Sequence, residues 1–118
     1  MADKSPIRST RHGDVLVVAF AERRITDEVV IHQMGEEVLR LIDAESAPKI
    51  VLDFGGVEHL SSAALGVLIS VHNRVKSRQG QMRLSAIAKP IFEVFRITKL
   101  DRLFQVHESV DQAVKSLA

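Results

Sequence analysis

Short runs of apolar residues alternate with segments of helical periodicity along most of this chain. Residues 14–21, DVLVVAFA, are rich in β-branched residues and have the length of a strand. Together with residues 7–11 they predict an antiparallel hairpin that turns at residues 12–14. Residues 49–54, KIVLDF, form a nearly continuous apolar run, which is typical of a parallel strand buried on both faces.

Two long helices are predicted around this buried strand. The first begins at Thr26, a favourable N-cap, and stops before Pro48, because the residue that precedes a proline avoids helical geometry. Its apolar stripe consists of Ile31, Met34, Val38, Leu41 and Ile42. The second helix begins at Ser61 or Ser62 and is closed by Gln79–Gly80. Its stripe consists of Ala64, Leu68, Val71 and Val75.

Shorter elements follow toward the C-terminus. Alternation over residues 81–87 predicts another strand, and residues 103–106 predict a last short one. Pro90 fits the first turn of a third helix, which turns inward Ile91, Val94 and Phe95. Ser109 and Gln112 make the capping box of a final helix.

The order of these elements, β-β-α-β-α-β-α-β-α, predicts an α/β fold. Strands that alternate with helices imply parallel pairing through right-handed crossovers. We expect a single domain over residues 1–118. Its mixed sheet of about five strands has the N-terminal hairpin first and parallel strands after it, and is packed with four helices.

Composition narrows the classes of function. The formal net charge is +1 and the aromatic content is 4%, so neither a strong field nor stacking platforms favour nucleic acid. There is no cysteine, and no apolar run approaches the ~20 residues that cross a bilayer. We therefore expect a soluble, cytoplasmic protein without nucleic-acid or membrane partners. The sequence has no glycine-rich phosphate loop and no metal-ligand spacing among its histidines, so we expect no cofactor and no metal.

The most informative stretch is VEHLSSAALGVLI, residues 57–69, which places two serines at the start of the second helix. In one interpretation a serine only caps the helix, a role worth ~1 kcal/mol. In a second, Ser62 is a nucleophile on a strand-to-helix turn. That motif requires a glycine two residues away on each side, where this chain has Leu60 and Ala64. Nothing specifies a carboxylate that would orient His59 as a base, so we do not expect an enzyme.

In a third interpretation the serine is a phosphoacceptor. A phosphate at a helix N-terminus meets free backbone N–H groups, so the fold tolerates it. About two negative charges would nevertheless appear on the surface and oppose a docked partner.

The segment IVLDFGGVEHLSSAALGVLI resembles the STAS domain, the family named for sulfate transporters and anti-sigma factor antagonists. The family motif has the form Asp-Ser-Ser/Thr-Gly-Leu-Gly and follows a buried strand and a loop. Ser61 stands at the Asp and Ser62 at the serine that is phosphorylated, followed by Ala63, Ala64, Leu65 and Gly66. Residues 80–114 resemble the family's C-terminal part, through Gly80, Pro90, Phe95, Leu100 and Phe104. The resemblance covers nearly the whole chain after residue 14 and is closest to stand-alone bacterial anti-sigma factor antagonists.

This resemblance implies regulation by partner switching. An unphosphorylated antagonist binds an anti-sigma factor that is also a serine kinase, phosphorylation of Ser62 releases it, and a serine phosphatase resets it. Ser61 is the alternative acceptor. The implied partner-binding surface consists of Glu22, Arg23, Arg24, Glu58, His59, Ser61, Ser62, Ala63 and Gly66. We expect a monomer or a weak homodimer, and the alternative function is a STAS-like scaffold or adaptor that is never phosphorylated.

Overall fold

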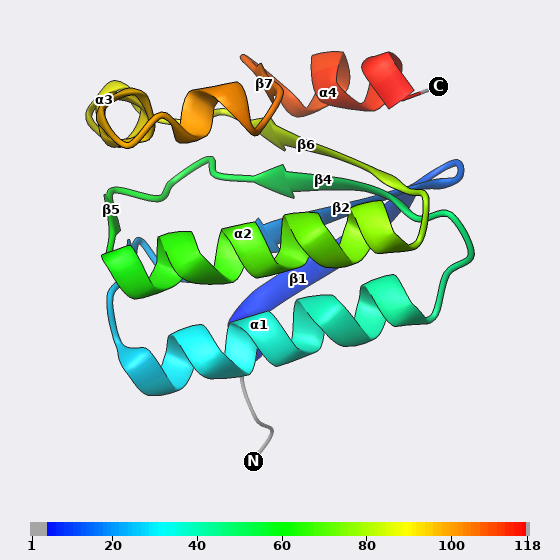
Figure 1. Ribbon diagram of the computed structural model, residues 1–118, viewed down its shortest axis with the longest axis horizontal. Helices are drawn as coiled ribbons and strands as arrows, with labels where there is room; N and C mark the ends of the chain where they lie inside the picture. The colour runs from blue at the N-terminus through cyan, green and yellow to red at the C-terminus, as the bar shows by residue number, and fades with distance from the viewer. Residues whose placement is uncertain (1–4, 118) are drawn as a thin grey trace.

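Five strands form one mixed sheet in the order β1-β2-β4-β6-β7 in the computed structural model, which describes residues 5–117 (Figure 1). β1 (Ile7–His12) and β2 (Val15–Phe20) pair antiparallel as the predicted hairpin. β4 (Lys49–Asp53), β6 (Gln81–Ser85) and β7 (Val106–His107) follow in parallel. The predicted fold class is therefore confirmed.

Helices cover both faces of this sheet. α1 (Glu28–Asp43) and α2 (Ser62–Ser77) lie side by side on one face (Figure 1). α4 (Val110–Leu117) packs against the strands on the other face. α3 (Lys89–Ile97) and a 3₁₀ turn, Leu100–Arg102, connect β6 to β7.

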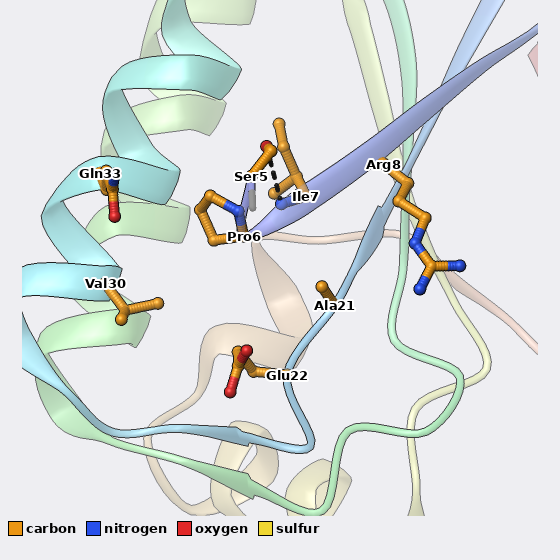
Figure 2. Close-up of a pocket in the computed structure, with 8 residues that line it drawn as sticks. All are labelled: Ser5, Pro6, Ile7, Arg8, Ala21, Glu22, Val30 and Gln33. Atoms are coloured by element: carbon orange, nitrogen blue, oxygen red, sulfur yellow. Dashed lines mark hydrogen bonds between the residues drawn. The ribbon is translucent and has the colours of Figure 1, made fainter. Parts of the chain in front are cut away.

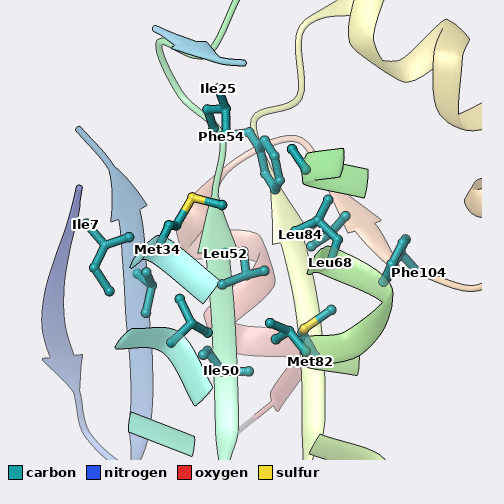
Figure 3. Close-up of a cluster of buried hydrophobic side chains, with 14 of the residues drawn as sticks. Ile7, Ile25, Met34, Ile50, Leu52, Phe54, Leu68, Met82, Leu84 and Phe104 are labelled. Carbon is teal, nitrogen blue, oxygen red and sulfur yellow. The ribbon is translucent and has the colours of Figure 1, made fainter. Parts of the chain in front are cut away.

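β4 shows why its sequence is apolar at nearly every position. Ile50 and Leu52 point into the main core beneath α1 and α2, where Figure 3 shows them among Met34, Leu68 and Leu84. Val51 points to the opposite face and joins a smaller core under α4. A strand that is covered on both faces needs apolar side chains at odd and even positions alike.

The two long helices begin at the same end of the sheet and run beside each other. Their close approach depends on Gly35, since a Cβ atom there would lie 3.1 Å from Val67 Cγ1. At their other end, the Arg74 guanidinium donates to the Asp43 carboxylate over 2.6 Å, and Arg78 donates to the Glu45 carbonyl. The starts of α1 and α2 are therefore held in a fixed relation.

Several sequence predictions need correction. The N-cap of α1 is Asp27 rather than Thr26, because the Asp27 carboxylate accepts from the amides of Val29 and Val30. Residues 103–106 do not form the predicted strand: β7 contains only Val106 and His107, and Leu103 is 40% exposed.

The turn after α2 also differs from the prediction. Gln79, not Gly80, takes the left-handed conformation, with φ of 59°. Gly80 is needed for a different reason, since a Cβ atom there would lie 2.2 Å from the Pro48 carbonyl oxygen. The glycine therefore permits β6 to enter the sheet beside the start of β4.

Candidate functional site

Two very short strands bring the predicted surface residues together. β3 (Arg24–Ile25) and β5 (His59–Leu60) pair in parallel, with Arg24 opposite His59 and Ile25 opposite Leu60. The amides of Glu58 and His59 both donate to the Arg23 carbonyl, over 2.7 Å and 3.2 Å. The amide of Ser61 donates to the Ile25 carbonyl over 3.1 Å. Segments far apart in the sequence, 22–25 and 58–62, thus form one surface at the start of α2.

The two adjacent serines have different environments. Ser61 is the N-cap of α2: its backbone is extended, and its Oγ accepts from the Ala64 amide over 3.2 Å. Ser62 is the first residue of the helix and is exposed. Its hydroxyl forms no hydrogen bond with any residue from 5 to 117. Ser61 therefore caps α2, and Ser62 presents its hydroxyl to solvent.

The start of α2 offers unused donors to an anion. In the described part of the chain the amides of Ser62 and Ala63 have no acceptor, and the first turn contains no acidic residue. A helix N-terminus carries partial positive charge in addition to these donors. An anion at this end of α2 would therefore meet free donors and partial positive charge.

The exposed face of α2 next to Ser62 carries small residues. Ala63 is exposed, and Gly66, one turn after Ser62, is exposed as well. A Cβ atom added to Gly66 would meet no atom within 4 Å, so nothing in the fold itself requires glycine at this position. A small residue that the fold does not need is consistent with close approach by another molecule.

The polar and charged side chains next to Ser62 are open to solvent. Arg23, Arg24, Glu58 and His59 are all exposed. The contact between Arg23 and Glu58 is 3.9 Å long with side chains 80% and 58% exposed, and such a surface pair contributes little to stability.

Glu22 borders a cavity of about 540 Å³ between β1, the end of β2 and α1. Figure 2 shows Val30 and Gln33 on α1 at one side of this cavity and Glu22 next to Ala21 on the segment that follows β2. The predicted surface therefore reaches from Ser62 to the edge of the main sheet.

A hollow that the sequence analysis missed adjoins the predicted surface. A groove of about 270 Å³ lies between β5 and α3, and it is lined by Glu58, His59, Leu60, Pro90, Ile91 and Val94. Val94 was predicted to point inward but is 39% exposed, whereas Ile91 and Phe95 are buried as predicted. The helical spacing of the three residues is right, but no other element covers Val94.

We also searched the titratable side chains for a metal site and for a base beside Ser62. Within residues 5–117 no group of three or more His, Cys, Asp or Glu side chains is arranged to hold a metal ion. No hydrogen bond joins His59 to Ser62 in the described structure. Burial lowers the pKa of His72, whose ring packs edge-on against Phe104 with ring centroids 5.4 Å apart.

No helix between residues 5 and 117 is both long and apolar enough to span a membrane.

Comparison with known proteins identifies the family. Residues 7–113 match the model of the STAS domain. An anti-sigma-B factor antagonist of Listeria monocytogenes is 22% identical over 103 residues, which cover 84% of this chain and 82% of the relative. BtrV of Bordetella bronchiseptica, a candidate anti-sigma factor antagonist, is 30% identical over 81 residues, which cover 69% of each chain.

A solved structure shows the same fold. The STAS domain protein from Planctomyces limnophilus, described as an anti-sigma-factor antagonist, superposes with a TM-score of 0.86. It covers 94% of this chain and 97% of its own, at 24% sequence identity. With the family model matching most of its length, this chain belongs to the STAS domain family.

Proposed function

We propose that this chain is an anti-sigma factor antagonist that works by partner switching and is not an enzyme. In its unphosphorylated form it binds an anti-sigma factor serine kinase through the surface around Ser62. Phosphorylation of Ser62 releases the kinase, and a serine phosphatase restores binding. The proposal rests on one observation. Ser61 caps α2, whereas Ser62 presents a free hydroxyl.

The geometry around Ser62 supports docking in the neutral state. The small residues Ala63 and Gly66 allow close approach, and the groove beside Val94 accepts an apolar side chain. The exposed charges at Arg23, Arg24 and Glu58 give the partner its orientation. Relatives named as anti-sigma factor antagonists support this choice of partner class.

The same geometry supports release by phosphorylation. The phosphate would be stabilised by the free amides at the start of α2, so the fold persists. The partner would instead face a bulky group with about two negative charges where a neutral hydroxyl had stood. Unfavourable charge juxtaposition across an interface costs several kcal/mol, which lowers affinity roughly a hundredfold or more.

Binding of variants tests the proposal. The Ser62→Ala chain serves as bait in a lysate of the source organism, and the captured kinase is then titrated against each variant by calorimetry. Ser62→Ala should bind as tightly as the unmodified chain, and Ser62→Asp should bind roughly a hundredfold more weakly. Ser46→Asp is the matched control. Ser46 is exposed like Ser62, but it stands before β4 in the chain, whereas Ser62 stands after it.

The control should leave affinity unchanged. Equal affinity of Ser62→Ala and Ser62→Asp would contradict the switch. It would favour the alternative function, a STAS scaffold or adaptor whose serine is never modified.

A further inference from the structure

A further cavity lies at the carboxyl ends of β6 and β7, and Ser62 is not among the residues that line it. It has a volume of about 460 Å³ and is bounded by the ends of β6 and β7 and the first turns of α3. Its walls include the apolar Ile87, Phe92 and Val106 and the polar Lys89, His107 and Glu108. Mostly apolar cavities of this size with a few polar groups are typical of small-molecule sites, and open α/β sheets bind ligands beyond the carboxyl ends of their strands.

Two buried polar atoms at the carboxyl ends of β6 and β7 lack partners within residues 5–117. Ser85 is fully buried, and its Oγ has no hydrogen-bond partner among residues 5–117. In the same part of the chain the Nε2 atom of His107 is buried and also unpartnered. The two residues lie directly opposite each other in the β6–β7 register, and His107 lines the cavity. Buried polar groups in folded proteins are nearly always paired, so two neighbouring exceptions point to a polar group that this site receives.

The charged groups at the cavity indicate what kind of molecule fits. α3 begins without a side-chain cap, and the amide of Lys89 has no acceptor in the described structure. Its ammonium forms no ion pair within residues 5–117. A carboxylate here would meet a cation and the positive end of the helix. Glu108 and the apolar walls oppose a multiply charged ligand such as a di- or triphosphate.

We propose that this cavity binds a small amphipathic monocarboxylic acid. Its carboxylate is held by Lys89 and the start of α3, and its apolar body packs against Ile87, Phe92 and Val106. A ring nitrogen of His107, which also lines the cavity, faces the ligand once it is bound. This site goes beyond the proposed partner switching, because none of its lining residues belongs to the surface around Ser62.

Titration of the full chain with 3-phenylpropionate, followed by ¹H–¹⁵N NMR, tests this proposal. Saturable shifts should be confined to residues 85–92 and 105–108, and the ring signals of His107 should move with them. 3-Phenylpropanol, which has the same apolar body without the carboxylate, should bind at least tenfold more weakly. Lys89→Gln should weaken 3-phenylpropionate binding to a similar extent. Lys76→Gln, the matched control at an exposed position of α2, should leave binding unchanged.

Three results would overturn the proposal. The first is the absence of saturable shifts at millimolar 3-phenylpropionate. The second is equal binding of the acid and the alcohol, and the third is a set of shifts that centres on Ser62. Because Lys89 is exposed, its substitution leaves the core intact, and an unchanged spectrum of the free variant verifies this.

Discussion

Replacing each of the two adjacent serines by alanine separates their roles through stability alone. In Ser61→Ala, the amide of Ala64 loses the Oγ acceptor that lies 3.2 Å away. Loss of such an N-cap costs about 1 kcal/mol of unfolding free energy. For a chain of 118 residues, an unfolding entropy of about 0.25 kcal/mol/K converts this cost into a fall in Tm of about 4 °C. Ser62 is exposed and makes no hydrogen bond within the described structure, so Ser62→Ala should change the free energy by less than about 0.5 kcal/mol.

Thermal and urea unfolding followed by circular dichroism at 222 nm measures both values. Ser61→Asp belongs in the same series, because an aspartate also caps a helix and should restore most of the stability that alanine removes. Equal losses for the two alanine variants, or a larger loss for Ser62→Ala, would refute the assignment of cap and free hydroxyl. That result would also remove the main observation behind the proposed function.

Three further predictions concern other positions. Gly66→Ala should raise stability by about 0.5–1 kcal/mol in urea unfolding, since its Cβ meets nothing within 4 Å, yet it should weaken kinase binding in calorimetry. Unchanged kinase affinity would remove Gly66 from the surface. Gly80→Ala should cost about 2 kcal/mol or more in the same unfolding assay, because its Cβ would lie 2.2 Å from the Pro48 carbonyl; a neutral effect would contradict this packing. Burial lowers the pKa of His72 in the folded chain, so below about pH 6.5 the unfolded chain binds more protons than the folded one. The unfolding free energy should therefore fall as the pH decreases below about 6.5. His72→Gln should reduce that fall. An identical pH dependence in wild type and variant would show that His72 does not contribute.

The long elements of the fold could be predicted from the sequence because each has a period that matches its burial. The stripe Ala64, Leu68, Val71 and Val75 is buried as predicted, and the apolar run of β4 is covered on both faces. β3 and β5 could not be predicted, since two residues are too few to show any period. Their pairing depends on tertiary contacts, and it is this pairing that gathers the loops next to Ser62.

Of the candidate site, too, only a part could be predicted from the sequence. The serine motif is visible in the sequence, but which serine caps α2 depends on backbone geometry at a single residue boundary. The groove beside Val94 was hidden because helical spacing predicts which side chains share a face, not whether another element covers that face. The unpartnered Ser85 could not be predicted, because alternation shows that Ser85 and Leu84 point to different faces of β6 but not that both faces are covered.

Phosphosite mapping tests whether phosphorylation of Ser62 releases the kinase. The purified chain is incubated in the source lysate with ATP, recovered, and analysed by intact mass and peptide fragmentation, while the proteins that remain bound are measured in parallel. We expect one phosphate, located on Ser62, and loss of the bound kinase as that phosphate accumulates. A kinase that dissociates while Ser62 stays unmodified, or a phosphate carried on Ser61 instead, would contradict this expectation.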